Sequence, residues 1–260
     1  GRSARLYGGQ AVLVLAALAA WRLGLARAGG QAALVLAAVA LGALLALLGQ
    51  TYQTGADTWQ LFALWAVLLL PWLVAARSTA MTLLWLAVAQ TALLLWLGEH
   101  GAGLRLTWLV AGLLNAGLHL AWHGPGRRLE GLDGALGPRL LALAALALLV
   151  PAALSDVFSW NSLRGTGLLG WLLGTAAVAW SAWRRPPDLL LLSAVALAVI
   201  VVDTALLARL LFELRLEAMA FLVLTGAVIG QVAWVTGWLR RLAHGERPVP
   251  LAGEAEPIDG

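Results

Sequence analysis

The 260-residue chain is 62% hydrophobic and 12% charged, with a mean hydropathy of +0.87. Soluble domains are roughly half apolar and a quarter charged, so this chain has too few charges to cover a surface in water. It contains no Cys, which excludes thiol catalysis, disulfides and cysteine-ligated metals. All 17 basic residues are Arg, which excludes a Schiff-base lysine and a P-loop lysine. The composition predicts an integral membrane protein whose partner is the lipid bilayer and not nucleic acid.

Nine long apolar stretches separate the charged residues. A bilayer core is about 30 Å thick, so roughly 20 apolar residues of helix cross it. The stretches are rich in Leu, Ala and Val without period-two alternation, which favours helices over barrel strands. The first stretch contains Arg22, the sixth is short, and the eighth must pass Asp203. The predicted spans are residues 6–25, 32–48, 58–76, 78–98, 106–122, 140–154, 165–183, 189–208 and 218–239.

Short links join the predicted helices, for example at residues 29–30 and 186–187. Short links place consecutive helices antiparallel in one bundle. We therefore expect an all-α, polytopic transmembrane bundle over residues 1–243. Residues 244–260, rich in Pro and acidic residues, are expected to form a disordered cytoplasmic tail. The chain begins with Gly1, so we expect native sequence upstream, and the first apolar run lacks a cleavage region and is interpreted as a retained helix.

The arginines predict the orientation in the membrane, because cytoplasmic loops carry an excess of basic residues. With nine spans, eleven of the 17 arginines fall on one side. This places the N-terminus outside and the C-terminus inside a bacterial inner membrane. The outer side then collects acids and amides, which a ligand arriving from outside meets first. They are Gln50, Tyr52, Gln53, Asp57, Glu99, His100, Asp156, Asn161, Glu213 and Glu217.

A Gly-Gln-Thr-Tyr-Gln turn at residues 49–53 precedes a Leu-Phe-Ala-Leu-Trp stretch at residues 61–65 and Pro71. This arrangement resembles a family of bacterial predicted membrane proteins catalogued only as domain of unknown function 2157. The resemblance covers about residues 8–122. It implies a polytopic inner-membrane protein whose relatives often carry an N-terminal soluble segment. It implies no activity, and no catalytic residue is carried over from it.

Asp203 stands within a run of Val and Ile. An acid at mid-helix costs about 2.5–3.5 kcal/mol on insertion scales, so it must face the bundle, protonate or pair. Arg209 lies on another face of the same helix, so we expect the partner on a different helix. One interpretation is a proton or cation site. The other, favoured by the charges that follow closely, is that the helix ends near Asp203 and places it at the outer interface.

The fifth predicted span carries Asn115, His119 and His123, which are spaced four apart and share one face. The two histidines have the spacing of a metal-binding pair, but no Glu accompanies them as in H-E-x-x-H. A third ligand would have to come from His244 or Asp133. We interpret the stripe as hydrogen bonding to neighbouring helices, and we assign no metal and no cofactor.

Two Gly-x-x-x-Gly motifs, Gly170 with Gly174 and Gly226 with Gly230, predict close helix packing. Packing inside the bundle and a homodimer face are both left open. Gln231 and Thr225, beside the second motif, are expected to add interhelical hydrogen bonds. There is no Gly-x-Ser-x-Gly elbow and no Ser near a His at a recognisable spacing, so no catalytic residue is assigned.

Three functional hypotheses follow. The first is binding or passage of a small polar solute or ion through a pocket bordered by Gln50, Tyr52, Gln53, Asp57 and Asp203, with Asn115 and His119 as further candidate ligands. The second is a non-catalytic structural subunit that binds a membrane partner protein or a second copy. The third, an intramembrane enzyme, needs three converging polar groups that the sequence does not assemble. The first and last four helices show no repeat, which argues against an inverted-repeat transporter.

Overall fold

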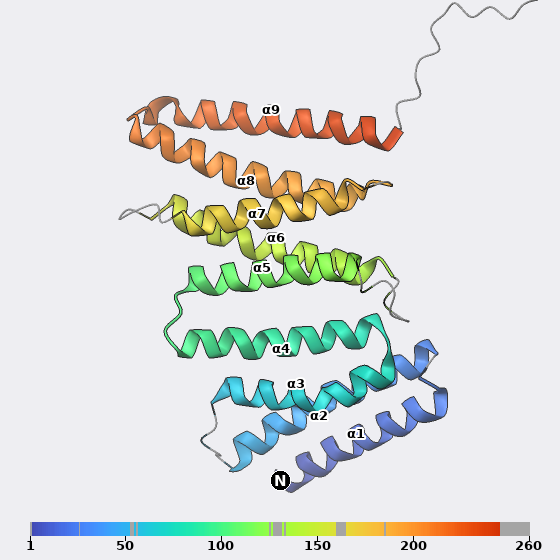
Figure 1. Ribbon diagram of the computed structural model, residues 1–260. Coiled ribbons are helices and arrows are strands. Elements are labelled where there is room, and N and C mark those ends of the chain that lie inside the picture. Colours follow the sequence, from blue (N-terminus) through green and yellow to red (C-terminus); the bar gives the residue numbers. More distant parts are fainter. Residues whose placement is uncertain are drawn as a thin grey trace, which may run out of the picture. The chain divides into compact units, whose positions relative to one another are not determined.

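The computed structural model describes residues 2–25, 27–52, 55, 57–124, 126, 132, 134–159, 165–184 and 186–244. These residues form nine α-helices and no strand (Figure 1). The helices are α1 (Arg2–Leu23), α2 (Ala28–Tyr52), α3 (Thr58–Ala76), α4 (Thr79–Glu99), α5 (Leu104–His123), α6 (Leu136–Val157), α7 (Thr166–Ala182), α8 (Leu189–Glu213) and α9 (Glu217–His244). The predicted all-α helical architecture is confirmed.

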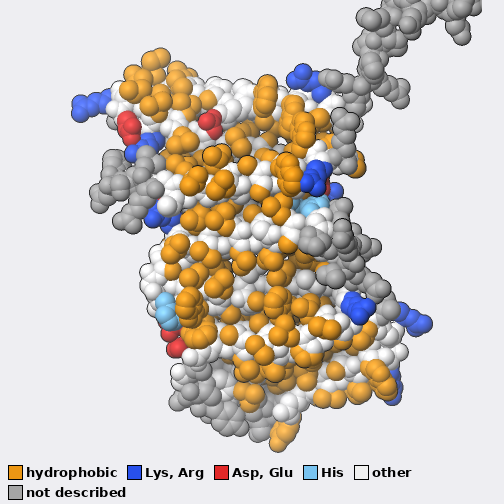
Figure 2. All heavy atoms as spheres, in the orientation of Figure 1, with side chains coloured by type: hydrophobic (Ala, Val, Ile, Leu, Met, Phe, Trp, Pro, Cys, Tyr) orange, Lys and Arg blue, Asp and Glu red, His pale blue; other side chains and the backbone are white. Residues whose placement is uncertain are grey.

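Seven of the helices in the described part of the chain are long and apolar enough to cross a membrane. The other two contribute shorter apolar stretches, Tyr7–Leu23 in α1 and Thr166–Ala182 in α7. Large apolar side chains cover the outer faces of the helices, and arginines lie near helix ends (Figure 2). Hydrocarbon is the solvent that such a surface requires. The chain is a multi-pass membrane protein.

Two predicted helix ends are wrong. The sixth helix is not short, because α6 spans 22 residues and begins at Leu136, with Pro138 tolerated in its first turn. The eighth helix does not end near Asp203, since α8 continues to Glu213. The residues that follow Asp203 are mostly Leu and Ala, which favour helix. An Arg209–Glu213 ion pair with an N–O distance of 2.7 Å supports the last turn.

The chain divides into two compact units, Gly1–Ser181 and Ala182–Gly260. In the first unit, helices that follow one another in the chain pack side by side from α1 to α6, and α4 also contacts α2 and α6. In the second unit, α8 and α9 form a helical hairpin. The single bundle over residues 1–243 stays a prediction, and residues 245–260 of the predicted tail lie outside the described residues.

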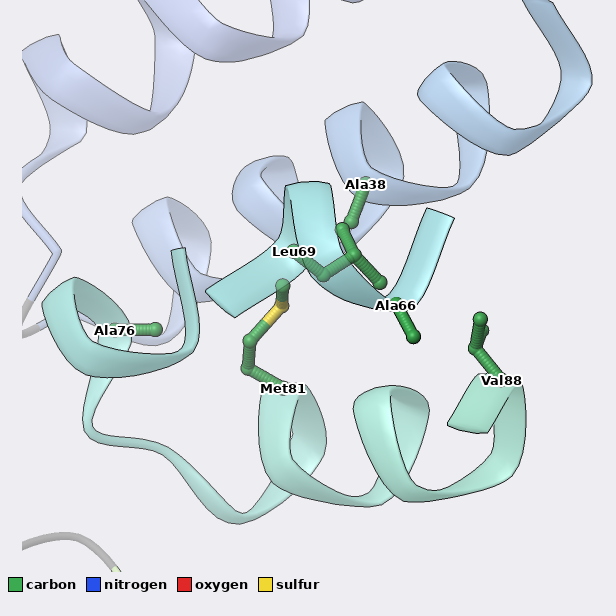
Figure 3. Close-up of a cluster of buried hydrophobic side chains, with 6 residues drawn as sticks. All are labelled: Ala38, Ala66, Leu69, Ala76, Met81 and Val88. Atoms are coloured by element: carbon green, nitrogen blue, oxygen red, sulfur yellow. The ribbon is translucent and has the colours of Figure 1, made fainter. Parts of the chain in front are cut away.

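Small side chains and Trp hold α2, α3 and α4 together. The buried cluster between them consists of Ala38, Ala66, Leu69, Ala76, Met81 and Val88 (Figure 3). The Trp65 indole N–H donates to the Ala38 carbonyl at 3.0 Å, and the Trp85 N–H donates to the Ala66 carbonyl, also at 3.0 Å. Gly42 leaves room for the Trp65 ring, since a Cβ at Gly42 would lie 2.4 Å from it. Close backbone approach therefore fixes these three helices.

Candidate functional site

Asp203 and Gln231 meet at the middle of the α8–α9 hairpin. Gln231 Nε2 donates a hydrogen bond to Asp203 Oδ2. Asp203 lies ten residues before the end of α8 at Glu213, which is about 15 Å of helix at 1.5 Å per residue. Gln231 lies 14 residues after the start of α9 and 13 before its end. Both polar groups therefore lie far from the ends of helices long enough to cross a bilayer.

No cation pairs with Asp203 among the described residues. Arg209, the nearest on α8, binds Glu213 toward the end of the helix. The Asp203 side chain is exposed, and its neighbours in the chain include Val201 and Val202. In this part of the structure, Gln231 Oε1 and Thr204 Oγ1 are buried and accept no hydrogen bond. The Asp203 carboxyl group thus has one hydrogen-bond donor, the Gln231 amide. Gln231 Oε1 and Thr204 Oγ1 have no hydrogen-bond partner in this part of the structure.

A buried polar stripe runs along α5 in the first unit. Asn115 Nδ2 donates to Gln90 Oε1 of α4 at 2.6 Å and to the Ala111 carbonyl at 2.9 Å. Gln90 Nε2 donates back to Asn115 Oδ1 at 3.4 Å. The ring of His119 stands edge-on to the ring of His123, with 4.8 Å between their centroids. The stripe thus forms hydrogen bonds to neighbouring helices, which is the interpretation that the sequence favoured.

His119 is fully buried and binds groups from two other helices. Its Nδ1 lies 2.7 Å from the Pro138 carbonyl of α6, and its Nε2 lies 2.6 Å from Ser181 Oγ of α7. A carbonyl only accepts, so Nδ1 carries a proton. The neutral ring then accepts the Ser181 O–H at Nε2. Ser181 also lies 2.7 Å from the Val178 carbonyl, to which it donates when Nε2 is protonated. Sequence reasoning missed this pair because its members are 62 residues apart.

A buried ion pair joins α5, α6 and α7. Arg105 donates to Asp156 Oδ1 at 2.7 Å, and the Asp156 side chain has no exposed surface. Asp156 Oδ2 accepts from the backbone N–H groups of Gly167 at 2.6 Å and Leu168 at 3.1 Å. These groups belong to the first turn of α7, where unpaired N–H donors favour an anion. Asp156 therefore caps α7 from the neighbouring helix, a buried contact that its predicted place on the polar outer side does not reveal.

The chain's relatives are indicated by one family model. A model described as "Predicted membrane protein (DUF2157)" matches residues 1–82. The resemblance expected from the Gly-Gln-Thr-Tyr-Gln turn is thus confirmed for residues 1–82. The match ends 40 residues before the predicted limit at Trp122. No curated protein and no solved structure matches the chain.

The DUF2157 segment, residues 1–82, contains α1, α2, α3 and the start of α4. Four of the predicted pocket residues lie in it. Gln50 is exposed near the end of α2, and Asp57 is exposed at the start of α3, where it accepts a hydrogen bond from Gln60 Nε2 at 3.3 Å. The Tyr52 side chain and Gln53 lie outside the described residues. Asp203 belongs to the second unit, so its place in one pocket with the residues of the DUF2157 segment stays a prediction.

The two Gly-x-x-x-Gly motifs have different surroundings. A Cβ at Gly170 would lie 2.1 Å from Leu109 of α5, and one at Gly174 would lie 2.3 Å from Leu149 of α6. This motif therefore packs inside the first unit. Gly226 and Gly230 on α9 have no such neighbour within 4 Å. Thr225 beside them is exposed, whereas Gln231 makes the interhelical hydrogen bond that its position predicts.

No group of three His, Asp or Glu side chains lies close enough to hold a metal ion within the ranges that the structure describes. Asp133, one candidate third ligand for the histidine pair, lies outside those ranges. His244, the other candidate, ends α9 in the second unit, where its Nδ1 lies 2.8 Å from the Arg240 carbonyl.

Proposed function

We propose that this membrane protein binds or passes a small ion or polar solute and that Asp203 is its central group. The observation that carries the proposal is a mid-span carboxyl group that is bound to an amide and, within the described part of the chain, to no cation. An ionised acid at this depth costs about 2.5–3.5 kcal/mol, which one neutral hydrogen bond offsets only in part. An ionisable residue inside a membrane span is a candidate functional site for this reason, and Asp203 is the candidate in this chain.

The membrane that fits this proposal is the bacterial inner membrane. The distribution of the arginines supports it, with the N-terminus outside and the C-terminus inside. Under this orientation the DUF2157 segment presents Gln50 and Asp57 at the outer side, and a ligand from outside meets these exposed groups first.

A non-catalytic structural or partner-binding subunit is the alternative. The polar groups of the first unit favour it, because Asn115, His119 and Asp156 are buried and bound to other residues of the chain. Gly226 and Gly230 add an open face of small residues on α9. The two functions differ in what they require of Asp203, since only ion or solute binding needs a carboxyl group at that position.

Replacing Asp203 by Asn tests the proposed function. We expect Asp203→Asn to lower proton or cation flux into liposomes containing the purified protein by about tenfold or more, because an amide neither carries charge nor releases a proton. Flux is followed with a pH-sensitive or cation-sensitive dye inside the vesicles. Glu213→Gln, at the exposed end of the same helix, is the matched control and should retain the flux. If Asp203→Asn and Asp57→Asn both leave flux and solute binding unchanged, the structural alternative is correct.

A further inference from the structure

We infer that Asp203 and Gln231 form a proton-binding site in which the Gln231 carboxamide turns when the carboxyl gains or loses its proton. This inference rests on the proposed ion-binding function and names the ion. A carboxamide presents two donors on one side and an acceptor on the other. It can therefore hydrogen-bond either form of a neighbouring carboxyl group.

The observed contact is one that an ionised carboxyl group can accept. Gln231 Nε2 donates to Asp203 Oδ2, and this leaves Gln231 Oε1 buried without a donor. Half a turn of the amide exchanges the two atoms. The protonated carboxyl then donates its O–H to Oε1, so the buried oxygen gains a partner and the net charge at mid-span disappears. Each protonation state thus has one hydrogen bond between Asp203 and Gln231 across the hairpin.

The number of oxygen ligands favours a proton over a metal cation. Hard cations such as Mg²⁺ and Ca²⁺ take six to eight oxygen ligands. At this contact the hairpin offers the two Asp203 oxygens and Gln231 Oε1, and the described residues contain no cluster of three acidic or His side chains. A proton on Asp203 requires a single acceptor, and Gln231 provides it.

No second titratable side chain lies opposite Asp203 in the described part of the α8–α9 hairpin. The helix packed against α8 in the second unit is α9, which has no acidic, basic or His residue between Glu217 and Arg240. On α8 itself, Asp188 precedes the first turn and Arg209 binds Glu213 toward the other end. The charge of the hairpin centre is therefore set by Asp203 alone.

Dicyclohexylcarbodiimide tests the inference, because this lipid-soluble reagent reacts with a protonated carboxyl in an apolar setting. The O–H adds across one C=N bond to give an O-acylisourea, which rearranges to a stable N-acylurea. We expect mass spectrometry of the whole protein in liposomes to find the adduct on Asp203 and labelling to fall as pH rises. Asp203→Glu should keep the adduct and Asp203→Asn should lose it. The exposed Asp57 and the ion-paired Asp156 are internal controls and should remain unlabelled.

Two results overturn the proton assignment. One is the absence of an adduct on Asp203 at any pH while the protein remains folded. The other is protection of Asp203 by sodium at fixed pH, which would identify a metal cation as the ligand. Gln231→Leu, which removes the amide, should change the extent of labelling at Asp203 at fixed pH, because the carboxyl group loses its hydrogen-bond partner. The flux assay separates the proposed function from the proton assignment. If flux depends on Asp203 but no adduct forms, the proposed function stands and the proton assignment fails. If the adduct forms but Asp203→Asn leaves the flux unchanged, the proton assignment stands and the proposed function fails.

Discussion

Asp156→Ala is expected to lower the free energy of unfolding by about 3–5 kcal/mol, the range for breaking a buried ion pair by removing one partner. The Asp156 side chain is fully buried and bonds to Arg105 and to two backbone N–H groups of α7. Its loss leaves the α7 N-terminus uncapped and the guanidinium without its carboxylate. The measurement is reversible unfolding in detergent, followed by circular dichroism.

A second ion pair, with the same N–O distance but an exposed acid, is the control for the effect of burial on stability. Arg209 and Glu213 have the same 2.7 Å separation, but the Glu213 side chain is 59% exposed. Glu213→Ala should change the unfolding free energy by less than about 1 kcal/mol, as for most exposed pairs. Asp156→Asn should give a smaller loss than Asp156→Ala, because an amide oxygen still accepts from the helix N–H groups. Equal effects of Asp156→Ala and Glu213→Ala would show that the buried junction is not a stabilising element.

His119→Ala is expected to destabilise the first unit by about 3 kcal/mol, through the cavity that it creates and the loss of two interhelical hydrogen bonds. His119 has no exposed surface and holds α6 and α7 through Pro138 and Ser181. The same unfolding measurement reports the loss. Ser181 either donates to Nε2 of a neutral His119 ring or accepts from Nε2 of a doubly protonated ring. Alanine can form neither hydrogen bond.

Two variants control for the histidine experiment. His123→Ala removes the neighbouring ring, which is half-buried, and should have the smaller effect. Ser181→Ala removes the hydroxyl alone and should lower stability by about 1–3 kcal/mol, since the buried Nε2 loses its partner. Wild-type stability of His119→Ala would contradict the account of the polar stripe as interhelical packing.

Composition and apolar run length were sufficient to predict the helices. The span over residues 58–76 coincides with α3, and every other predicted span overlaps one helix. The ends were harder to predict where charge and helix propensity disagree. After Asp203, the charges indicated a helix end, but Leu and Ala continue the helix and Arg209 pairs along it with Glu213. Helix propensity and a local ion pair therefore decide this end.

The candidate site was predictable in part. Asp203 is conspicuous in the sequence because a charge within an apolar run is a local signal, and Gln231 was expected to bond between helices. Arg105 and Asp156 are 51 residues apart, and His119 and Ser181 are 62 apart. Neither pair has a local pattern, because their contacts depend on how α5, α6 and α7 pack. The charge of Asp156 thus suggested the polar outer side of the membrane, whereas packing makes its side chain a buried cap of α7.

The depth of Asp203 in the membrane is the central claim, and single-cysteine labelling tests it most directly. The chain contains no Cys, so each introduced thiol reports alone. Pro186→Cys, Asp203→Cys and Leu214→Cys place thiols before, within and after α8. With a membrane-impermeant maleimide, positions 186 and 214 should label from opposite sides of the membrane, and position 203 should label from neither. Labelling of position 203 at the rate of position 214 would place Asp203 at the water interface and contradict the account.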